Sequence, residues 1–219
     1  MNDHASRRPK AVLFDWDNTL VDSWDTIHDS MNTTLAHMGH DLWTADQTHE
    51  RVRKSLREAF PELFGDRWEE ARDVFYARFR EIHLQTLQVK AGAEAALSAF
   101  AEDGIYLGVV SNKSGDHLRA ESAHLDWNRF FGRVIGATDA PRDKPAIDPV
   151  LMALEPAGID PGQDVWFVGD TNIDMECASN AGCVGVLVGE GADSADFGDH
   201  NPDIRLADCI RLAGLVERF

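Results

Sequence analysis

The sequence predicts an α/β protein with a parallel sheet covered by helices on both faces and a helical segment inserted after the first strand. Short apolar runs of strand length recur through the 219 residues, and from residue 91 onward they alternate with helical patterns. Between the first apolar run and residue 88 the pattern is helical instead. Strands that alternate with helices of this length form βαβ units, which build a three-layer α/β/α core.

The first expected strand is the apolar run at residues 11–14, which ends in two aspartates, Asp15 and Asp17. A period of two places both carboxylates on the same side if the extended geometry continues. Unpartnered buried charge is strongly unfavourable, so such a pair is normally metal-bound, ion-paired or catalytic. Thr19 adds a hydroxyl to the same turn. Trp16 should point the other way, against either the sheet or the hinge of the inserted segment.

Residues 23–88 are predicted to form an all-helical insertion with its own small core. Apolar residues recur there every three or four positions, as on one face of a helix. Gly39 provides a stop for the first helix, Thr44 is a candidate N-cap for the second, and Pro61 should end that second helix. The three helices are expected at residues 24–38, 44–60 and 66–87. The remaining residues, 1–22 and 89–219, are expected to form the α/β core.

Polar residues follow the apolar strands of the core directly. Ser111 and Asn112 come after one strand and Asp170 after another, as Asp15 and Asp17 do after the first. Ligands bind at the carboxyl ends of the strands in parallel sheets, so a site is expected there. Strands are expected at residues 105–110, 133–136, 165–168, 184–188 and 204–206, with helices at 93–100, 115–125, 149–157, 175–181 and the C-terminus.

Composition restricts the class of protein and its partners. A net charge of −17 argues against nucleic acid or an anionic membrane as the main partner, because phosphate groups require a basic face. No apolar run reaches the roughly 18 residues of a membrane span, and Met1 to Lys10 lack the apolar segment of a secretory signal. Three cysteines without metal-ligand spacing suit reduced thiols, so the expected location is the cytoplasm.

Four motifs then carry a resemblance to a known family. They are Asp15-Trp16-Asp17-Asn18-Thr19, Ser111-Asn112, Lys144-Pro145 and Gly169-Asp170-Thr171-Asn172-Ile173-Asp174. In order and spacing they resemble the motifs of the haloacid dehalogenase superfamily. The insertion after the first strand and the sequence Val110-Ser111-Asn112-Lys113 look most like the phosphoglycolate phosphatase group. The resemblance spans nearly the whole core, whereas residues 23–88 match only in length and helical character.

This resemblance implies a Rossmann-like core with a helical cap and a Mg²⁺-dependent phosphatase acting on a small, anionic phosphorylated metabolite. Asp15 would be the nucleophile that forms an aspartyl-phosphate, and Asp17 the general acid and base. Asp15, the backbone carbonyl of Asp17, and Asp170 would bind Mg²⁺, which requires hard oxygen ligands. A dehalogenase would lack the second carboxylate, so Asp17 favours phosphoryl chemistry.

The remaining motif residues are expected to bind the phosphate or to support the site. The phosphate-binding candidates are Thr19, the Ser111 hydroxyl, the Asn112 backbone N–H and Lys144. Lys144 is also expected to be catalytic, as a fixed positive charge against the phosphoryl oxygens and the nucleophile. Asp174 is expected to orient Lys144 or a metal-bound water, and direct metal ligation by it stays open. Asn18 replaces the glycine that is usual after the second aspartate, and asparagine tolerates a left-handed backbone better than most residues.

Substrate choice is expected to come from the cap, whose basic residues include Arg53 and Arg57, four apart on one helix face. Phosphoglycolate is the leading substrate by resemblance alone, and the chain is expected to be a monomer or a homodimer. Two alternatives stay open. One is a phosphomutase of the same fold, in which the aspartyl-phosphate passes to a sugar. The other is a non-catalytic protein that binds phosphorylated metabolites.

Overall fold

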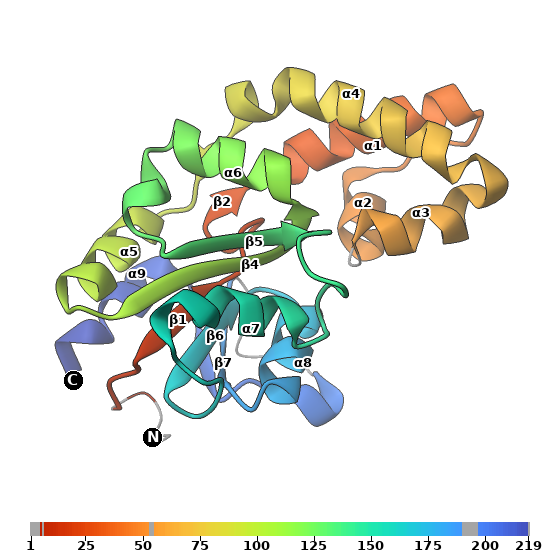
Figure 1. Ribbon diagram of the computed structural model, residues 1–219. Coiled ribbons are helices and arrows are strands. Elements are labelled where there is room, and N and C mark those ends of the chain that lie inside the picture. The colour runs from red at the N-terminus through yellow and green to blue at the C-terminus, as the bar shows by residue number, and fades with distance from the viewer. Residues whose placement is uncertain (1–4, 6, 53–54, 190–196, 219) are drawn as a thin grey trace. The chain divides into compact units, whose positions relative to one another are not determined.

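The computed structural model of the protein describes residues 5, 7–52, 55–189 and 197–218 (Figure 1). It divides the chain into two compact units, one made of Met1–Val21 with Val89–Phe219 and the other of Asp22–Gln88. The chain passes between them through two short paired strands, β2 (Val21–Asp22) and β3 (Gln88–Val89). Each unit is considered by itself below.

The larger unit is built on a sheet that has six strands within the described residues, in the order β5-β4-β1-β6-β7-β8. All adjacent strands pair in parallel, which confirms the predicted parallel α/β/α fold. The strands are β1 (Ala11–Phe14), β4 (Tyr106–Ser114), β5 (Arg133–Ala137), β6 (Val165–Gly169), β7 (Val184–Val188) and β8 (Ile204–Leu206).

Helices cover both faces of this sheet, with α5, α6 and α9 on one side and α7 and α8 on the other (Figure 1). Their bounds are α5 Ala93–Glu102, α6 Gly115–His124, α7 Asp148–Leu154, α8 Asn172–Asn180 and α9 Cys209–Ala213. Short 3-10 segments are η3 Trp127–Arg129, η4 Glu155–Ala157, η5 Gly198–His200 and η6 Val216–Arg218. Within the described residues, the helical patterns that alternate with strands from residue 91 onward correspond to these helices.

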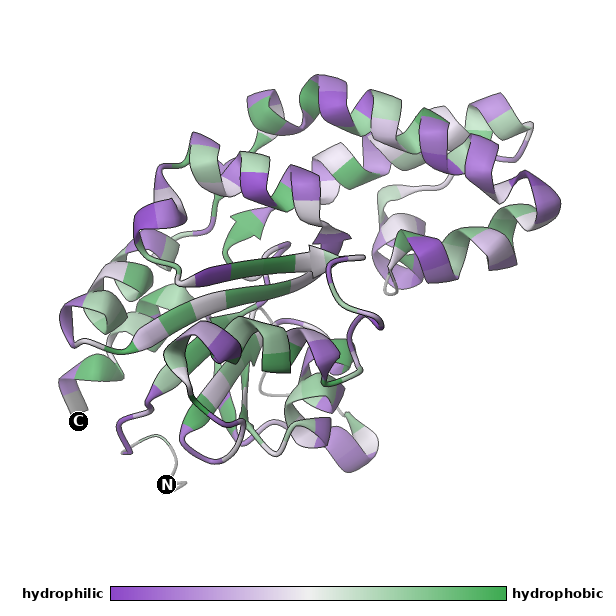
Figure 2. Ribbon diagram, viewed as in Figure 1, coloured by the Kyte–Doolittle hydropathy of each residue, from purple (hydrophilic) through white to green (hydrophobic). Residues whose placement is uncertain are grey.

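The sheet is apolar on both faces, as a sheet between two helical layers must be. Every residue of β1 is fully buried, and the strands of the core are predominantly hydrophobic (Figure 2). Leu13 and Phe167 pack with residues of α7 and α8 in one core cluster. Phe14 contacts Phe100 of α5 edge-on, on the other side. Alternate residues of β1 therefore supply both layers, and the strand is held firmly where it delivers Asp15.

Strand β4 is longer than the sequence pattern predicts. It runs to Ser114, and its register with β5 shifts between Val110 and Ser114. Ser111 and Asn112 therefore lie in the irregular end of the strand and not after it, which corrects the expected strand end at residue 110. An irregularity of this kind redirects side chains near the end of a strand.

The smaller unit is helical. It contains α1 (Trp24–Met38), α2 (Ala45–Arg51), α3 (Leu56–Phe64), the 3-10 segment η2 (Gly65–Arg67) and α4 (Trp68–Thr86). Gly39 ends α1 in the left-handed conformation, and Thr44 opens α2 through a capping box with Gln47, as their residue types indicated. Apolar residues of α1, α3 and α4 pack together, among them Leu35, Phe60 and Phe75.

The expected single helix at residues 44–60 is wrong. Val52 leaves the helical conformation after α2, and a separate helix α3 begins at Leu56 and runs through Pro61. Proline removes one intrahelical hydrogen bond there. Phe60 and Phe64, on either side of Pro61, are buried in the small core, and their burial offsets that loss.

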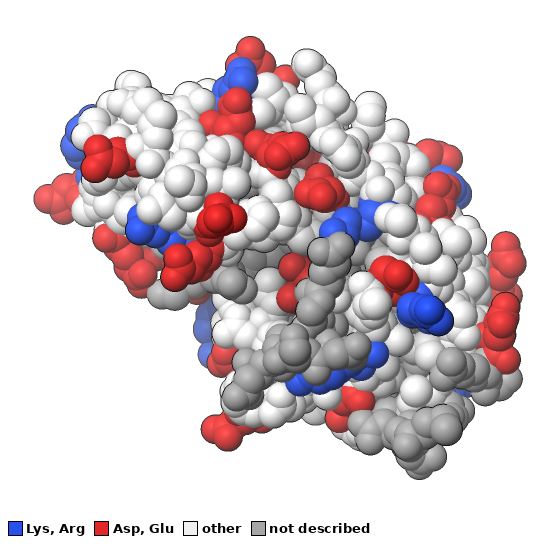
Figure 3. All heavy atoms as spheres, turned by 180° about the vertical axis from the view of Figure 1, so that it is seen from behind, with Lys and Arg blue, Asp and Glu red and all other residues white. Residues whose placement is uncertain are grey.

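None of the helices within the described part of the chain is long and apolar enough to cross a membrane. Acidic side chains are spread over the face in Figure 3, with basic ones interspersed among them, in keeping with the net charge of −17.

Candidate active site

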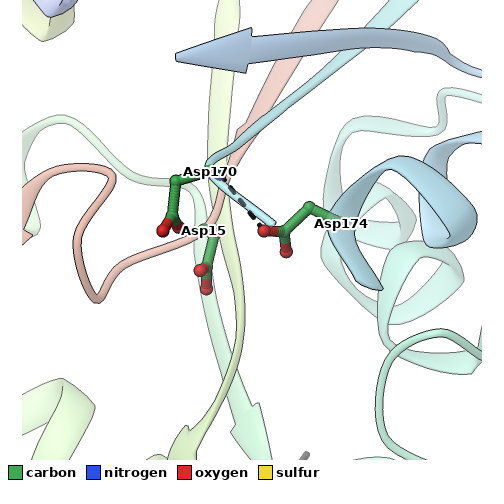
Figure 4. Close-up of side chains that lie close together, drawn as sticks. All are labelled: Asp15, Asp170 and Asp174. Atoms are coloured by element: carbon green, nitrogen blue, oxygen red, sulfur yellow. Dashed lines mark hydrogen bonds between the residues drawn. The ribbon is translucent and has the colours of Figure 1, made fainter. Parts of the chain in front are cut away.

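The ends of β1 and β6 are level with each other, and this brings the two motifs that follow them together. Phe14 pairs with Val168 in the parallel register, and the Asp15 N–H donates to the Val168 carbonyl at 2.8 Å. Asp170 follows directly after β6. The carboxylates of Asp15 and Asp170 therefore lie side by side at the carboxyl edge of the sheet (Figure 4).

Lys144 reaches this edge from the loop between β5 and α7. Its Nζ lies 2.8 Å from Asp15 Oδ1 and 2.7 Å from Asp174 Oδ1, and its side chain is 3% exposed. Burial by itself lowers the pKa of this ammonium, but the charges of Asp15 and Asp174 reverse that effect and raise it. Lys144 is therefore a fixed positive charge, and it touches the predicted nucleophile.

Asn112 holds the backbone of Lys144 in place. Its amide Nδ2 donates to the Lys144 carbonyl at 3.1 Å, and its Oδ1 accepts from the Lys144 N–H at 3.0 Å. The sequence predicted only a phosphate contact from the backbone N–H of Asn112. The side chain thus has a second task, which connects the end of β4 to the loop that carries the lysine.

Asp174 is completely buried and makes hydrogen bonds through both oxygens. Oδ1 accepts from Lys144, and Oδ2 accepts from the N–H of Asp170 at 3.2 Å and from the N–H and hydroxyl of Thr171 at 3.0 and 2.6 Å. Thr171 and Asp174 also form the capping box that begins α8. Asp174 thus holds the Lys144 ammonium, and its orienting role stays a prediction.

Asp15, Asp170 and Asp174 form a group that suits a divalent cation. One carboxylate oxygen from each lies within 4.8 Å of the others (Figure 4). Burial raises the pKa of Asp15 to about 6 despite the opposing charge of Lys144, and burial together with the charges of Asp174 and Asp15 raises the pKa of Asp170 well above its usual value. Three carboxylates face one ammonium here, so a hard divalent cation would compensate the excess negative charge.

Thr19 and Ser111, the two hydroxyl residues predicted to bind phosphate, are both buried. The Thr19 hydroxyl donates to Asp170 Oδ1 at 3.1 Å, and since a hydroxyl has one hydrogen, it supports the carboxylate in this arrangement. The Ser111 Oγ accepts from the N–H of Lys113 at 3.2 Å, which leaves its own hydrogen for another acceptor. Asn18, in the same turn as Thr19, has the left-handed φ of 62° that its residue type tolerates.

Residues 12–188 match the family model described as haloacid dehalogenase-like hydrolase. The chain belongs to this family. The match covers the larger part of the chain and includes all four motifs. The resemblance inferred from those motifs is thereby confirmed, as is the prediction of an enzyme.

Individual relatives of this haloacid dehalogenase-like hydrolase are named as enzymes that hydrolyse phosphate compounds, among them phosphatases of a phosphoric monoester. A phosphoglycolate phosphatase of Chromobacterium violaceum is 29% identical over 86% of this chain and 89% of its own length. A Clostridium perfringens protein with the provisional name pyrophosphatase PpaX is 28% identical over 96% of this chain and 98% of its own. The crystal structure of a predicted phosphoglycolate phosphatase from Haemophilus somnus has the same fold, with a TM-score of 0.82 at 21% identity, over 95% of this chain and 98% of that one.

One basic residue of this hydrolase was not among the predicted site residues. Lys113 lies in the irregular end of β4, and its Nζ is 2.6 Å from Asp17 Oδ1 and 3.0 Å from Glu121 Oε2. Its position directly after Ser111-Asn112 was a usable signal. Glu121 had none, because an acidic residue in a helix normally faces solvent.

Trp16 has a defined role in this arrangement. Its indole is fully buried, packs edge-on against Trp127 with ring centroids 5.7 Å apart, and donates from Nε1 to Glu121 Oε2 at 2.7 Å. The sequence left the sheet and the hinge open as its surroundings. The residue contacts α6 and the segment that follows α6.

Two arginines, Arg53 and Arg57, are predicted to contact substrate. Arg57 is on α3 and half-buried. Arg53 lies outside the described residues. Their part in substrate binding stays a prediction.

Proposed function

We propose that this haloacid dehalogenase-like hydrolase is a Mg²⁺-dependent phosphatase of a small phosphorylated metabolite, with phosphoglycolate as the leading candidate, and that it acts through an aspartyl-phosphate. The observation that carries the proposal is the contact of Lys144 with Asp15 beside Asp170 and Asp174. It combines a positioned carboxylate, a fixed cation and excess negative charge for a metal. The relatives named as phosphatases support the substrate class.

Asp15 attacks phosphorus through a carboxylate oxygen while the bond to the ester oxygen breaks, and Asp17 donates a proton to that leaving oxygen. Asp17 then accepts a proton from the water that attacks the aspartyl-phosphate, so the enzyme returns to its initial state. Lys144 keeps Asp15 oriented and places positive charge against the phosphoryl oxygens, with Ser111 and the Asn112 N–H as further donors.

Mg²⁺ would be held by Asp15, Asp170 and the backbone carbonyl of Asp17, and when bound it neutralises charge between the anionic nucleophile and the anionic phosphate. Asp174 Oδ1 accepts from Lys144 and its Oδ2 accepts from three donors of Asp170 and Thr171, which supports an orienting role for this residue. Oδ1 keeps a lone pair, so direct ligation by Asp174 stays open. Asp170 accepts from Thr19 through one oxygen only.

We propose that residues 23–88 act as the cap. We assign to it the exclusion of water and the choice of substrate, with Arg57 as a candidate contact to the non-reacting end of an anionic substrate. Such a cap would admit small soluble metabolites to the site, and no nucleic acid or membrane partner is proposed.

A phosphate-release panel tests this function. Purified enzyme with Mg²⁺ is given phosphoglycolate, other phosphorylated acids, sugar phosphates and pyrophosphate. Release of phosphate from at least one ester is expected, with loss on chelation by EDTA. Asp15→Asn should reduce turnover by at least 10³-fold, because the neutral amide is a far weaker nucleophile. The matched control is Asp164→Asn, a surface aspartate paired with Lys10, which should behave as wild type.

Two outcomes would contradict the phosphatase. Isomerisation of a sugar phosphate without free phosphate would favour the phosphomutase. Binding of phosphorylated compounds with no turnover, unchanged by Asp15→Asn, would favour the non-catalytic binding protein. Trapping of a phosphorylated enzyme by acid quench, absent in Asp15→Asn, tests the aspartyl-phosphate separately.

A further inference from the structure

Asp17 is attached to a buried chain of polar groups that the reaction above does not use. The chain runs from Asp17 Oδ1 to Lys113 Nζ at 2.6 Å, on to Glu121 Oε2 at 3.0 Å, and ends at Trp16 Nε1, which is 2.7 Å from the same Glu121 oxygen. Its members come from the turn after β1, the irregular end of β4, and α6. All of them belong to the larger unit.

Burial distinguishes this chain from an ordinary surface ion pair. The side chains of Lys113 and Glu121 are 5% and 1% exposed, and that of Asp17 is 20% exposed. Surface pairs rearrange easily in water, whereas a buried ion that leaves its partner stays uncompensated. Lys113 is therefore confined between its two carboxylates. Burial lowers its pKa, but the charges of Asp17 and Glu121 outweigh this and raise it.

Trp16 makes the far end of the chain rigid. Its ring is locked by burial and by contact with Trp127, so its single N–H has one direction, toward Glu121. Glu121 is fixed in turn, and so is the ammonium that it holds. Trp16, which lies between the two aspartates in the sequence, thereby helps to position Asp17 through Glu121 of α6 and Lys113 of β4.

The two aspartates also have separate cations. Lys144 contacts Asp15, and Lys113 contacts Asp17. The carboxylate group with metal-ligand geometry consists of Asp15, Asp170 and Asp174, and Asp17 is not a member. A side-chain carboxylate that carries a proton to a leaving oxygen must stay out of this group of metal-binding carboxylates and in one defined place. A displacement of 1 Å can reduce a rate by about 10²-fold.

We propose that Lys113 is a positioning residue. It holds the Asp17 side chain apart from the carboxylates of Asp15, Asp170 and Asp174, in the place from which Asp17 protonates the leaving group. Glu121 and Trp16 act through Lys113. This role rests on the proposed function, because it assumes phosphate ester cleavage with Asp17 as the acid. In that step the Asp15 oxygen bonds to phosphorus, the ester P–O bond breaks, and the proton of Asp17 moves to the departing oxygen.

The dependence of the rate on the leaving group tests this role. The value of kcat/KM reports the steps up to departure of the leaving group. An alkyl oxygen needs a proton to depart, whereas 4-nitrophenolate departs as a stable anion and needs little help from an acid. In Lys113→Met we expect kcat/KM to fall about 100-fold for the best alkyl phosphate of the panel and less than about 5-fold for 4-nitrophenyl phosphate.

Three further variants test whether the loss comes from misfolding and whether Glu121 and Trp16 act through Lys113. The double variant Lys113→Met, Glu121→Gln also removes the Glu121 charge, which would otherwise stay buried without its lysine. The glutamine amide oxygen still accepts from Trp16, so the double variant should show the same selective loss. Trp16→Phe keeps an aromatic ring but removes the N–H, and a smaller loss with the same alkyl preference is expected. Lys10→Met removes a lysine that is 68% exposed and paired with Asp164. It should hydrolyse both esters as wild type does.

The outcomes separate the two proposals. Equal losses for the two esters in folded variants, or wild-type hydrolysis of the alkyl ester by Lys113→Met, would overturn the positioning role while wild-type activity upholds the phosphatase. A wild-type enzyme that releases phosphate from neither ester would overturn the proposed function, and the positioning role with it.

Discussion

Asn112 illustrates how one side chain of the site supports another. Its amide pairs with both the N–H and the carbonyl of Lys144, and so fixes the backbone from which the lysine reaches Asp15. A lysine side chain has several rotatable bonds, and its ammonium stays beside Asp15, the proposed nucleophile, only if its backbone is held. The position of the Lys144 ammonium therefore depends on a neutral residue at the end of β4.

Asn112→Leu tests this support, because leucine has a similar volume but no hydrogen-bonding groups. Two buried backbone groups would lose their partners, so we expect a destabilisation of about 2–4 kcal/mol and a fall in kcat of at least about 10-fold. Denaturant unfolding and phosphate release measure the two effects.

The matched control is Asn180→Leu. Asn180 donates to the adjacent carbonyl, that of Pro145, from an exposed position at 3.0 Å. Water can replace that bond, so stability and kcat should change little. Equal effects of the two substitutions would contradict the support of Lys144 by Asn112.

At the scale of elements, the site depends on the close approach of α8 to the end of β6. A Cβ atom on Gly169 would lie 2.3 Å from Asp174 Cβ and 2.4 Å from its Cγ. The glycine thus allows the first turn of α8 to reach the strand, and with it the carboxylate that holds Lys144. The short capping box of Thr171 and Asp174 orients that turn.

Gly169→Ala should displace Asp174 and the lysine it holds. We expect a destabilisation of about 1–3 kcal/mol, as for other overpacked positions, together with at least a 10-fold loss of phosphate release. Thermal unfolding and steady-state kinetics measure these effects. Gly162→Ala is the control, since its added Cβ would meet no atom within 4 Å. Wild-type activity in Gly169→Ala would show that the approach of α8 is unimportant.

At the scale of the whole molecule, the site concentrates negative charge in a protein whose net charge is already −17. Burial raises the pKa of Asp15 to about 6, so the folded protein binds that proton more tightly than the unfolded chain does. Without a metal, this group should therefore favour folding increasingly as the pH falls from above 6 toward 4, and disfavour folding at neutral pH.

Magnesium should reverse this dependence. The cation binds ionised carboxylates, so it should raise the melting temperature at pH 7.5 by a few degrees and by much less at pH 5, where protons compete for Asp15. Thermal unfolding with Mg²⁺ or EDTA across this pH range measures the effect. Asp170→Asn should abolish the Mg²⁺-dependent rise. A rise as large at pH 5 as at pH 7.5 would contradict the carboxylate cluster as the metal site.

Local patterns were sufficient for much of the fold. Strand β7 lies where its apolar run predicted it. Helix α1 ends at Gly39 because glycine readily adopts the left-handed conformation that terminates a helix. Local patterns failed where distant packing decided the outcome. Pro61 was expected to end a helix, yet burial of Phe60 and Phe64 keeps α3 intact around it.

The amino-acid sequence by itself determined the parallel α/β fold and the edge of the sheet at which the polar motifs lie, because strand period and strand-end residues are local properties. Lys144 was expected against the predicted nucleophile, and only the tertiary structure decided that Lys113 pairs with Asp17. Lys144 meets Asp15 and Lys113 meets Asp17 through contacts between residues about 100 or more positions apart. Glu121 and Trp16, 105 positions apart, join this arrangement because burial forces each polar group to find a partner.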